Sequence, residues 1–251
     1  MEIRTPAELA AQWQRRPCVV RGLLPANVLE RWDTDTLRRH CGHLPVLVRT
    51  YSTEHHHSMT PWSEDTQSLG SFLDDSTAGS KRQVALHFAA ERETGTLGEA
   101  LRPVASSLRQ WCEEALGETA ARIDEGVLRI SKLPWSFGAH YDCRPALVAQ
   151  LHGERTFELQ PYASGDYPDL HGTERLPGAA YRLTLRPGDV LHLPTLYTHA
   201  VKAPGAPPEV SILCGLFVDD STDDYVCNAR FRRDFAQRSQ DLRQRDHLRR
   251  R

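Results

Sequence analysis

The chain has 251 residues, of which 39% are hydrophobic and 25% charged, and its formal net charge is -2. These values are ordinary for a globular domain and exclude a polyelectrolyte that binds nucleic acid along its whole length. No apolar run approaches the roughly 18 residues of a membrane span, and residues 1–6 lack the features of a signal peptide. We therefore expect one cytoplasmic domain with no membrane partner.

The cysteines and histidines bear on metal chemistry. The six cysteines contain no CxxC pair, which argues against a zinc knuckle or a dithiol redox site and favours free thiols in a reducing compartment. The 12 histidines raise the chance of a metal site, and also the chance of a coincidental motif. The run at residues 55–57 illustrates the second case, because consecutive histidines on a polar loop project in different directions.

The first half of the chain predicts mixed α and β structure. Helices are expected at residues 7–15 and 27–40, and strands at residues 18–23 and 46–49, because Pro and Gly separate these segments. Residues 51–80 are polar and predict a loop with one short helix, which would form a lid or rim. Its acidic side chains would favour a basic or histidine-containing peptide; they are Glu64, Asp65, Asp74 and Asp75.

The second half begins with one helix and then changes its period. Apolar side chains recur at helical spacing over residues 97–116, and Gly117 provides a stop. The pattern then alternates with period two, which is typical of a β-sandwich or small barrel. Strands are expected at residues 127–133, 147–151, 155–159, 181–185, 190–193 and 210–218.

The end of the chain, residues 228–251, differs from the rest. It contains nine arginines against three aspartates, with a helical pattern and few apolar positions. We expect residues 1–227 to form the domain and residues 228–251 a helical tail outside it.

A candidate metal site combines two separate segments. His140 and Asp142 are two positions apart, so in an extended chain both side chains project to one face. His199 follows a turn and a buried strand at residues 186–194, and it would lie at the strand mouth. Two imidazoles and one carboxylate leave three positions open on Fe(II), which suits O₂ and a bidentate co-substrate.

Arg155 is the candidate anion anchor. Period two places Arg155 on the same face as Phe157 and Leu159, so its cation would point into the core. A buried guanidinium needs an anionic partner, and its planar fork matches a carboxylate. An internal ion pair with Glu154 or Glu158 is the structural alternative.

The order of these motifs resembles that of the JmjC and cupin-like oxygenases, which include protein asparaginyl hydroxylases. The resemblance rests on four motifs: HxD at residues 140–142, a Gly-x-Arg strand, the PGDxLxLP run at residues 187–194 and His199. Residues 17–23 also resemble the first strand of that family. The resemblance covers nearly the whole chain except the tail. It implies a mainly β fold with flanking helices around a double-stranded β-helix (jelly-roll) core. It also implies Fe(II) held by His140, Asp142 and His199, with 2-oxoglutarate and O₂ as co-substrates.

Two positions depart from the family. Lysine usually stands where this chain has Arg155, which preserves the charge, and Phe137 stands where some relatives have a threonine that assists 2-oxoglutarate. Another hydroxyl is therefore expected to help Arg155.

The expected activity is hydroxylation of an amino-acid side chain within a peptide or protein, such as a ribosomally made natural product. Alternatives are hydroxylation of a small metabolite, or a cupin-like hydrolase or isomerase that works without O₂. A further alternative is a nucleic-acid-binding module that uses the tail. Acidic residues close to the tail argue against the last, because they could pair with its arginines within a subunit or across a homodimer; they are Asp219, Asp220, Asp223 and Asp224.

Overall fold

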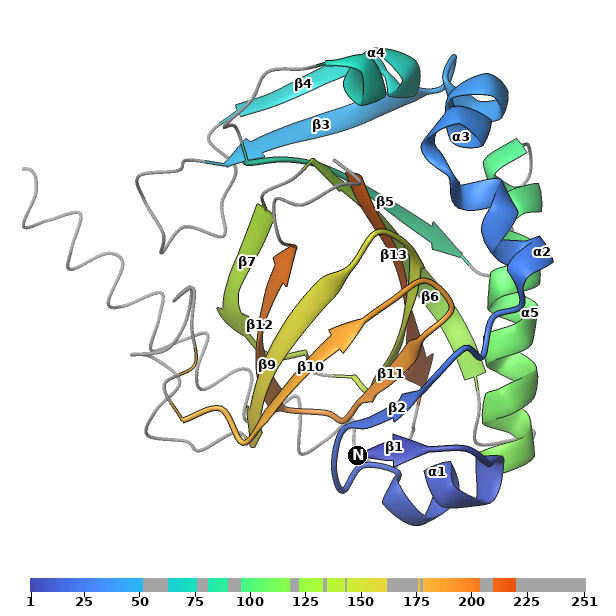
Figure 1. Ribbon diagram of the computed structural model, residues 1–251, viewed down its shortest axis with the longest axis vertical. Helices are drawn as coiled ribbons and strands as arrows, with labels where there is room; N and C mark the ends of the chain where they lie inside the picture. Colours follow the sequence, from blue (N-terminus) through green and yellow to red (C-terminus); the bar gives the residue numbers. More distant parts are fainter. Residues whose placement is uncertain are drawn as a thin grey trace, which may run out of the picture.

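Two β-sheets face each other in the computed structural model, and helices cover the outer face of the larger one (Figure 1). The structure describes residues 1–51, 63–75, 81–89, 96–117, 122–132, 135–142, 144–161, 176, 178–203 and 210–219. The larger sheet has nine strands in the spatial order β1 (Glu2–Ile3), β2 (Cys18–Val20), β11 (Val190–Leu193), β8 (Ala146–His152), β13 (Val210–Asp219), β6 (Arg122–Lys132), β5 (Lys81–Ala89), β3 (Pro45–Tyr51) and β4 (Ser63–Ser68). The smaller sheet has four strands in the order β10 (Tyr181–Leu185), β9 (Arg155–Pro161), β12 (Tyr197–Ala203) and β7 (Trp135–His140).

The chain passes repeatedly between the two sheets from β6 onward. Strands β6, β8, β11 and β13 lie in the larger sheet, whereas β7, β9, β10 and β12 form the smaller one. This arrangement is the double-stranded β-helix expected from the sequence, so the predicted fold class is confirmed. The remaining strands of the larger sheet extend it at both edges.

Alternation along β6 shows how the two faces of the larger sheet are used. Leu128 and Ile130 are fully buried in the same cluster as residues of the helices. Val127 and Arg129 point to the other side, where they line a pocket between the sheets. Because successive side chains of a strand point to opposite faces, one strand supplies both the helix-packed core and the pocket wall.

The helices are α1 (Pro6–Gln12), α2 (Ala26–Leu29), the 3₁₀ turn η1 (Glu30–Trp32), α3 (Thr34–Cys41), α4 (Leu69–Asp74) and α5 (Thr96–Leu116). Helix α5 packs on the larger sheet through buried side chains at helical spacing, among them Leu101, Val104 and Leu108. Each buried Leu contributes about 1.5–3 kcal/mol relative to an exposed one. This helix agrees with the one predicted at residues 97–116.

The turn before β11 explains the PGD motif. Gly188 has a φ of +92°, a conformation that side-chain-bearing residues rarely adopt. The Asp189 carboxylate accepts hydrogen bonds from the backbone N–H of Arg186 (2.9 Å), the backbone N–H of Gly22 (3.1 Å) and the Arg21 guanidinium (2.6 Å). The motif therefore joins the N-terminal strand β2 to the jelly roll.

Two sequence predictions in the first half were wrong in detail. The helix expected at residues 27–40 is divided into α2, η1 and α3, because the Asp33 side chain caps a new helix by accepting from Asp35 N (3.1 Å) and Thr36 N (3.0 Å). The polar segment at residues 51–80 contains the strand β4, which pairs with β3. An edge strand with exposed side chains lacks the apolar alternation that identifies buried strands.

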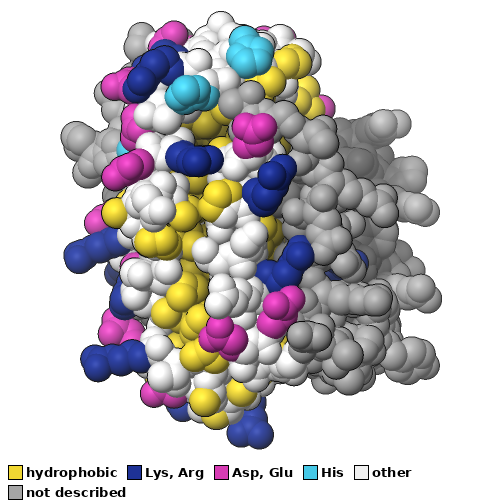
Figure 2. Space-filling model, turned by 90° about the vertical axis from the view of Figure 1, so that its right-hand side faces the viewer, with side chains coloured by type: hydrophobic (Ala, Val, Ile, Leu, Met, Phe, Trp, Pro, Cys, Tyr) yellow, Lys and Arg dark blue, Asp and Glu magenta, His cyan; other side chains and the backbone are white. Residues whose placement is uncertain are grey.

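The outer face of the helices carries charges of both signs (Figure 2). Lys and Arg side chains lie among Asp and Glu side chains there, with narrow apolar areas between them. On the described part of this face, no broad basic surface of the kind that binds nucleic acid is present. No described helix is both long and apolar enough to cross a membrane.

Candidate active site

The two predicted histidine ligands come together by strand pairing. His140 at the end of β7 is the register partner of His199 in β12, and their ring centroids are 4.0 Å apart with 54° between the planes. The ladder shifts register between His199 and Val201. His199 thus belongs to a strand of its own, which corrects the expectation that it lies just past the preceding strand.

Asp142 completes the group two residues beyond His140. Its Oδ2 lies 3.8 Å from Nε2 of His199, and one ligand atom from each of the three residues falls within 4.8 Å of the others. The carbonyl oxygen of Asp142 accepts a hydrogen bond of 3.0 Å from Leu196 N. Leu196 has a φ of +61°, a conformation that costs a non-glycine residue about 1–3 kcal/mol. The strained turn before β12 therefore holds the backbone of Asp142.

Hydrogen bonds orient both imidazole rings. Nδ1 of His140 lies 2.9 Å from Gly138 O, and Nδ1 of His199 lies 3.0 Å from Tyr197 O. A carbonyl oxygen only accepts, so each Nδ1 must carry the proton and donate it. In the neutral ring, Nε2 then carries the lone pair that can bind a metal ion. This is how histidines that bind metals are usually held.

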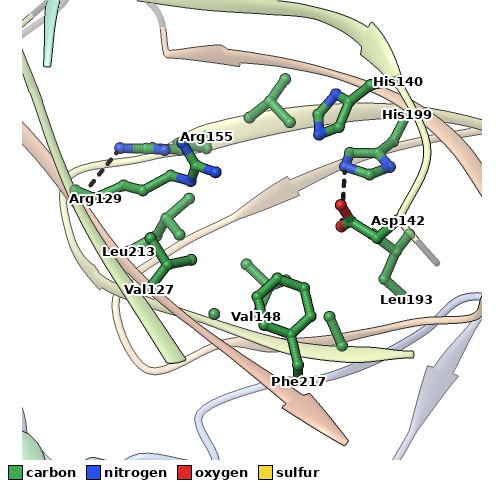
Figure 3. A pocket seen from close by; sticks show the side chains of 13 residues that line it. Val127, Arg129, His140, Asp142, Val148, Arg155, Leu193, His199, Leu213 and Phe217 are labelled. Carbon is green, nitrogen blue, oxygen red and sulfur yellow. Dashed lines mark hydrogen bonds and ion pairs between the residues drawn. The ribbon is translucent and has the colours of Figure 1, made fainter. Parts of the chain in front are cut away.

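The three residues lie at one end of a pocket between the sheets, which holds about 530 Å³ of space including its opening to solvent. Its walls are mostly apolar and come from both sheets; they include Val127, Val148, Leu193, Val201, Leu213 and Phe217. Figure 3 shows His140, Asp142 and His199 grouped at one end, with Arg155 and Arg129 at the other. Asp142 is the only acidic side chain among the described residues of the lining.

Arg155 is fully buried, as its position in β9 predicted. Its Nε donates to Ser211 Oγ (2.9 Å), while Nη2 donates to Ser131 Oγ (3.0 Å) and Ser211 O (3.1 Å). The two carboxylates considered as alternative partners of Arg155 form ion pairs with other residues: Glu154 with Arg186, and Glu158 with Lys202. Burial, and secondarily the charge of Arg129, lowers the pKa of the Arg155 guanidinium. An anion in the pocket would relieve both costs.

Comparison with known proteins finds one family model that matches the segment carrying these residues. The JmjC domain family matches residues 117–223, a range that includes all three triad residues and Arg155. The match covers 107 of the 251 residues. The arginine-rich residues 228–251 lie outside the match.

Solved structures show which known folds resemble this one. Three structures of YcfD from Escherichia coli have TM-scores of 0.56, 0.56 and 0.54, with 20%, 19% and 18% sequence identity. The alignments cover 86%, 86% and 84% of this chain but only 53%, 51% and 50% of YcfD, so the chain spans about half the length of that protein. One structure is described as a ribosomal oxygenase and another as a complex with cobalt and 2-oxoglutarate. No curated protein sequence matches the chain.

Two buried polar residues near the sequence motifs do not line the pocket. His192 is buried and stacks on Trp13, with ring centroids 4.4 Å apart and 21° between the planes. Gln150 donates to Ser211 Oγ (2.9 Å) and His152 O (2.6 Å). The histidines at residues 55–57 and the side chain of Phe137 lie outside the described residues.

The pocket also contains a residue that the sequence analysis did not single out, Arg129. Arg129 lies between Leu128 and Ile130 in a predicted strand, so a reader of the sequence assigns its side chain to a solvent-facing side. In the structure that side faces the second sheet. Alternation does place Val127, Arg129 and Ser131 on the same face of the strand. Only the structure shows that a second sheet covers this face.

Proposed function

We propose that this protein is a 2-oxoglutarate-dependent non-haem iron oxygenase, with Fe(II) held by His140, Asp142 and His199. The observation that carries the proposal is one pocket with two oriented imidazoles and a carboxylate at one end and a buried guanidinium at the other. Two histidines and one carboxylate suit non-haem Fe(II) and leave sites open for other ligands. The JmjC match and the likeness of fold to YcfD support the proposal.

Arg155 is proposed to bind the distal carboxylate of 2-oxoglutarate. Ser131 and Ser211 orient its guanidinium through their hydroxyl groups. These two hydroxyls are our candidates for the group that the sequence analysis expected to help Arg155. A charge-assisted hydrogen bond in an apolar pocket is about twice as strong as a neutral one. The pocket would thereby align the co-substrate with its oxo-acid end toward the triad.

The remaining residues of the pocket exclude water and position the substrate. With iron and 2-oxoglutarate bound, the centre would supply the activation of O₂ that converts 2-oxoglutarate to succinate and CO₂ while one oxygen atom enters a C–H bond. The apolar walls, including Val148, Leu213 and Phe217, keep that reaction away from bulk water.

The proposed substrate is an amino-acid side chain within a peptide or protein. The support is the fold shared with a protein described as a ribosomal oxygenase, together with the JmjC domain. A preference for basic peptides has less support. Glu64 pairs with Arg49 (2.9 Å) and Asp74 with Arg38 (2.7 Å), so two of the four acidic candidates already have partners in the chain.

Succinate formation tests the proposal. The purified protein would be incubated with Fe(II), 2-oxoglutarate, O₂ and a panel of peptides, including those encoded by neighbouring genes. We expect succinate together with a peptide that gains one oxygen by mass spectrometry. Turnover of a free amino acid alone would show the peptide preference to be wrong, and a metal-dependent product without succinate would favour a hydrolase or isomerase.

A further inference from the structure

Arg129 lies in the pocket beside Arg155, and nothing in the proposed reaction yet uses it. Its side chain lines the pocket and is half-buried, so a ligand can reach it. Figure 3 shows its guanidinium at the same end as that of Arg155, away from Asp142. The backbone oxygen of Arg129 also accepts a hydrogen bond of 3.4 Å from Nη2 of Arg155. One residue of β6 thus contacts the anchor and presents a second cation.

The bonds of Arg155 limit how it can bind a carboxylate. The edge formed by Nε and Nη2, one of the edges that can grip two carboxylate oxygens, is engaged with Ser211 and Ser131. A carboxylate at this end is therefore attracted by the charge of Arg155 but cannot form two hydrogen bonds to its Nε–Nη2 edge. A second donor would restore a two-point grip.

The strand position of Arg129 places it on the pocket side of the larger sheet. It lies in register between Ala85 on β5 and Leu213 on β13, and Leu213 also lines the pocket. Two guanidinium groups at one end of an apolar pocket repel each other. A bound anion would attract both and offset the repulsion, whereas a neutral ligand would leave it in place.

We propose that Arg129 is a second anchor for the distal carboxylate of 2-oxoglutarate, which it binds together with Arg155. This inference rests on the proposed function, because it assumes that 2-oxoglutarate occupies the pocket. It makes Arg129 a determinant of selectivity for dicarboxylic over monocarboxylic 2-oxo acids. The competing assignment is that Arg129 binds an acidic group of the primary substrate.

Binding measurements without turnover test the role of Arg129. The protein would be loaded with Mn(II) as a redox-inert ion and titrated calorimetrically with 2-oxoglutarate and with 2-oxobutanoate, which lacks the distal carboxylate. We expect Arg129→Gln to weaken 2-oxoglutarate binding about tenfold or more and to leave 2-oxobutanoate binding nearly unchanged. Arg129→Lys keeps the charge and should recover part of the loss. Arg102→Gln, on the exposed side of α5, is the matched control.

The outcomes separate this inference from the proposed function. If the wild-type protein does not bind 2-oxoglutarate, both are wrong. If the wild type binds it and Arg129→Gln binds it equally well, only the role of Arg129 is wrong. Equal losses for both ligands in a variant with unchanged thermal stability would also overturn the role, because they would reflect the metal end of the pocket. If Arg129→Gln binds 2-oxoglutarate as the wild type does but no longer oxidises the peptide, Arg129 binds the primary substrate instead.

Discussion

His140 and His199 are register partners across the β7–β12 ladder, and each donates its Nδ1 proton to the carbonyl of the residue two positions before it. The same local geometry is thus repeated on two antiparallel strands. It leaves Nε2 of each ring available for a metal ion, and Asp142 offers the third ligand atom, within 4.8 Å of the others.

Loss of any of these three donors should remove the metal. We expect Asp142→Ala and His199→Ala to weaken Fe(II) binding by more than about 100-fold, because even the groups that only orient ligands contribute 10- to 100-fold. Metal content after dialysis against Fe(II) under anaerobic conditions measures this. His40→Ala, an exposed histidine on α3, should bind like the wild type. Full succinate production by Asp142→Ala would refute the triad.

Arg155 should control affinity for the co-substrate. Arg155→Met removes a charge-assisted contact, so the KM for 2-oxoglutarate should rise at least about tenfold while metal binding is retained. Steady-state kinetics with varied 2-oxoglutarate measures it, and Arg182→Met, at an exposed position of β10, serves as the control. A wild-type KM in the Arg155 variant would place the anchor elsewhere.

Ser211 should act through Arg155 as a positioning residue. Its Oγ accepts from Arg155 Nε and from Gln150 Nε2, each at 2.9 Å. Ser211→Ala leaves two buried donors without this acceptor, so we expect a loss of about 1–3 kcal/mol in the free energy of unfolding and a higher KM for 2-oxoglutarate. Ser211→Thr keeps the hydroxyl and should recover the KM. A lowered stability with an unchanged KM in Ser211→Ala would reduce the residue to a structural role.

Acid should destabilise the protein through His192. Burial lowers the pKa of His192 from an ordinary value of 6.5 to about 3. Between these values the unfolded chain binds a proton that the folded protein does not, so the free energy of unfolding decreases as pH falls from 6.5 toward 3. His192→Phe keeps the stack on Trp13 and removes this proton. Denaturant unfolding at several pH values should show a shallower acid loss in the variant. Burial also lowers the pKa of His152, which is present in both proteins and contributes equally to both. If the free energy of unfolding falls equally steeply with pH in the two proteins, the prediction for His192 is wrong.

The arginine-rich tail should affect assembly more than chemistry. Residues 228–251 contain few apolar side chains and cannot form a core of their own, so we expect them to dock on another surface, such as a second subunit. Light scattering of the full chain and of a variant that ends at residue 227 compares their masses. Identical masses would reject a role in dimer formation, and Fe(II) binding should be the same in both.

Local patterns in the sequence determined much of this protein. Period-two alternation predicted six of the eight jelly-roll strands but not β7 or β12, which carry His140 and His199. Helical spacing predicted α5, and the two-residue separation of His140 and Asp142 predicted a shared face. These features depend on neighbours in the chain, so a single sequence contains them. The edge strand β4 was missed because backbone pairing holds it, and its polar side chains leave no alternation.

The tertiary structure alone decided the electrostatics of the pocket. Arg129 and Arg155 are 26 positions apart and lie in different sheets, so no local pattern relates them. Closure of the two sheets brings their charges to one end, and pairing of β6 with β13 brings Ser131 and Ser211 to Arg155. Strand alternation shows which side chains share a face, but whether that face meets water or another sheet depends on contacts between distant segments.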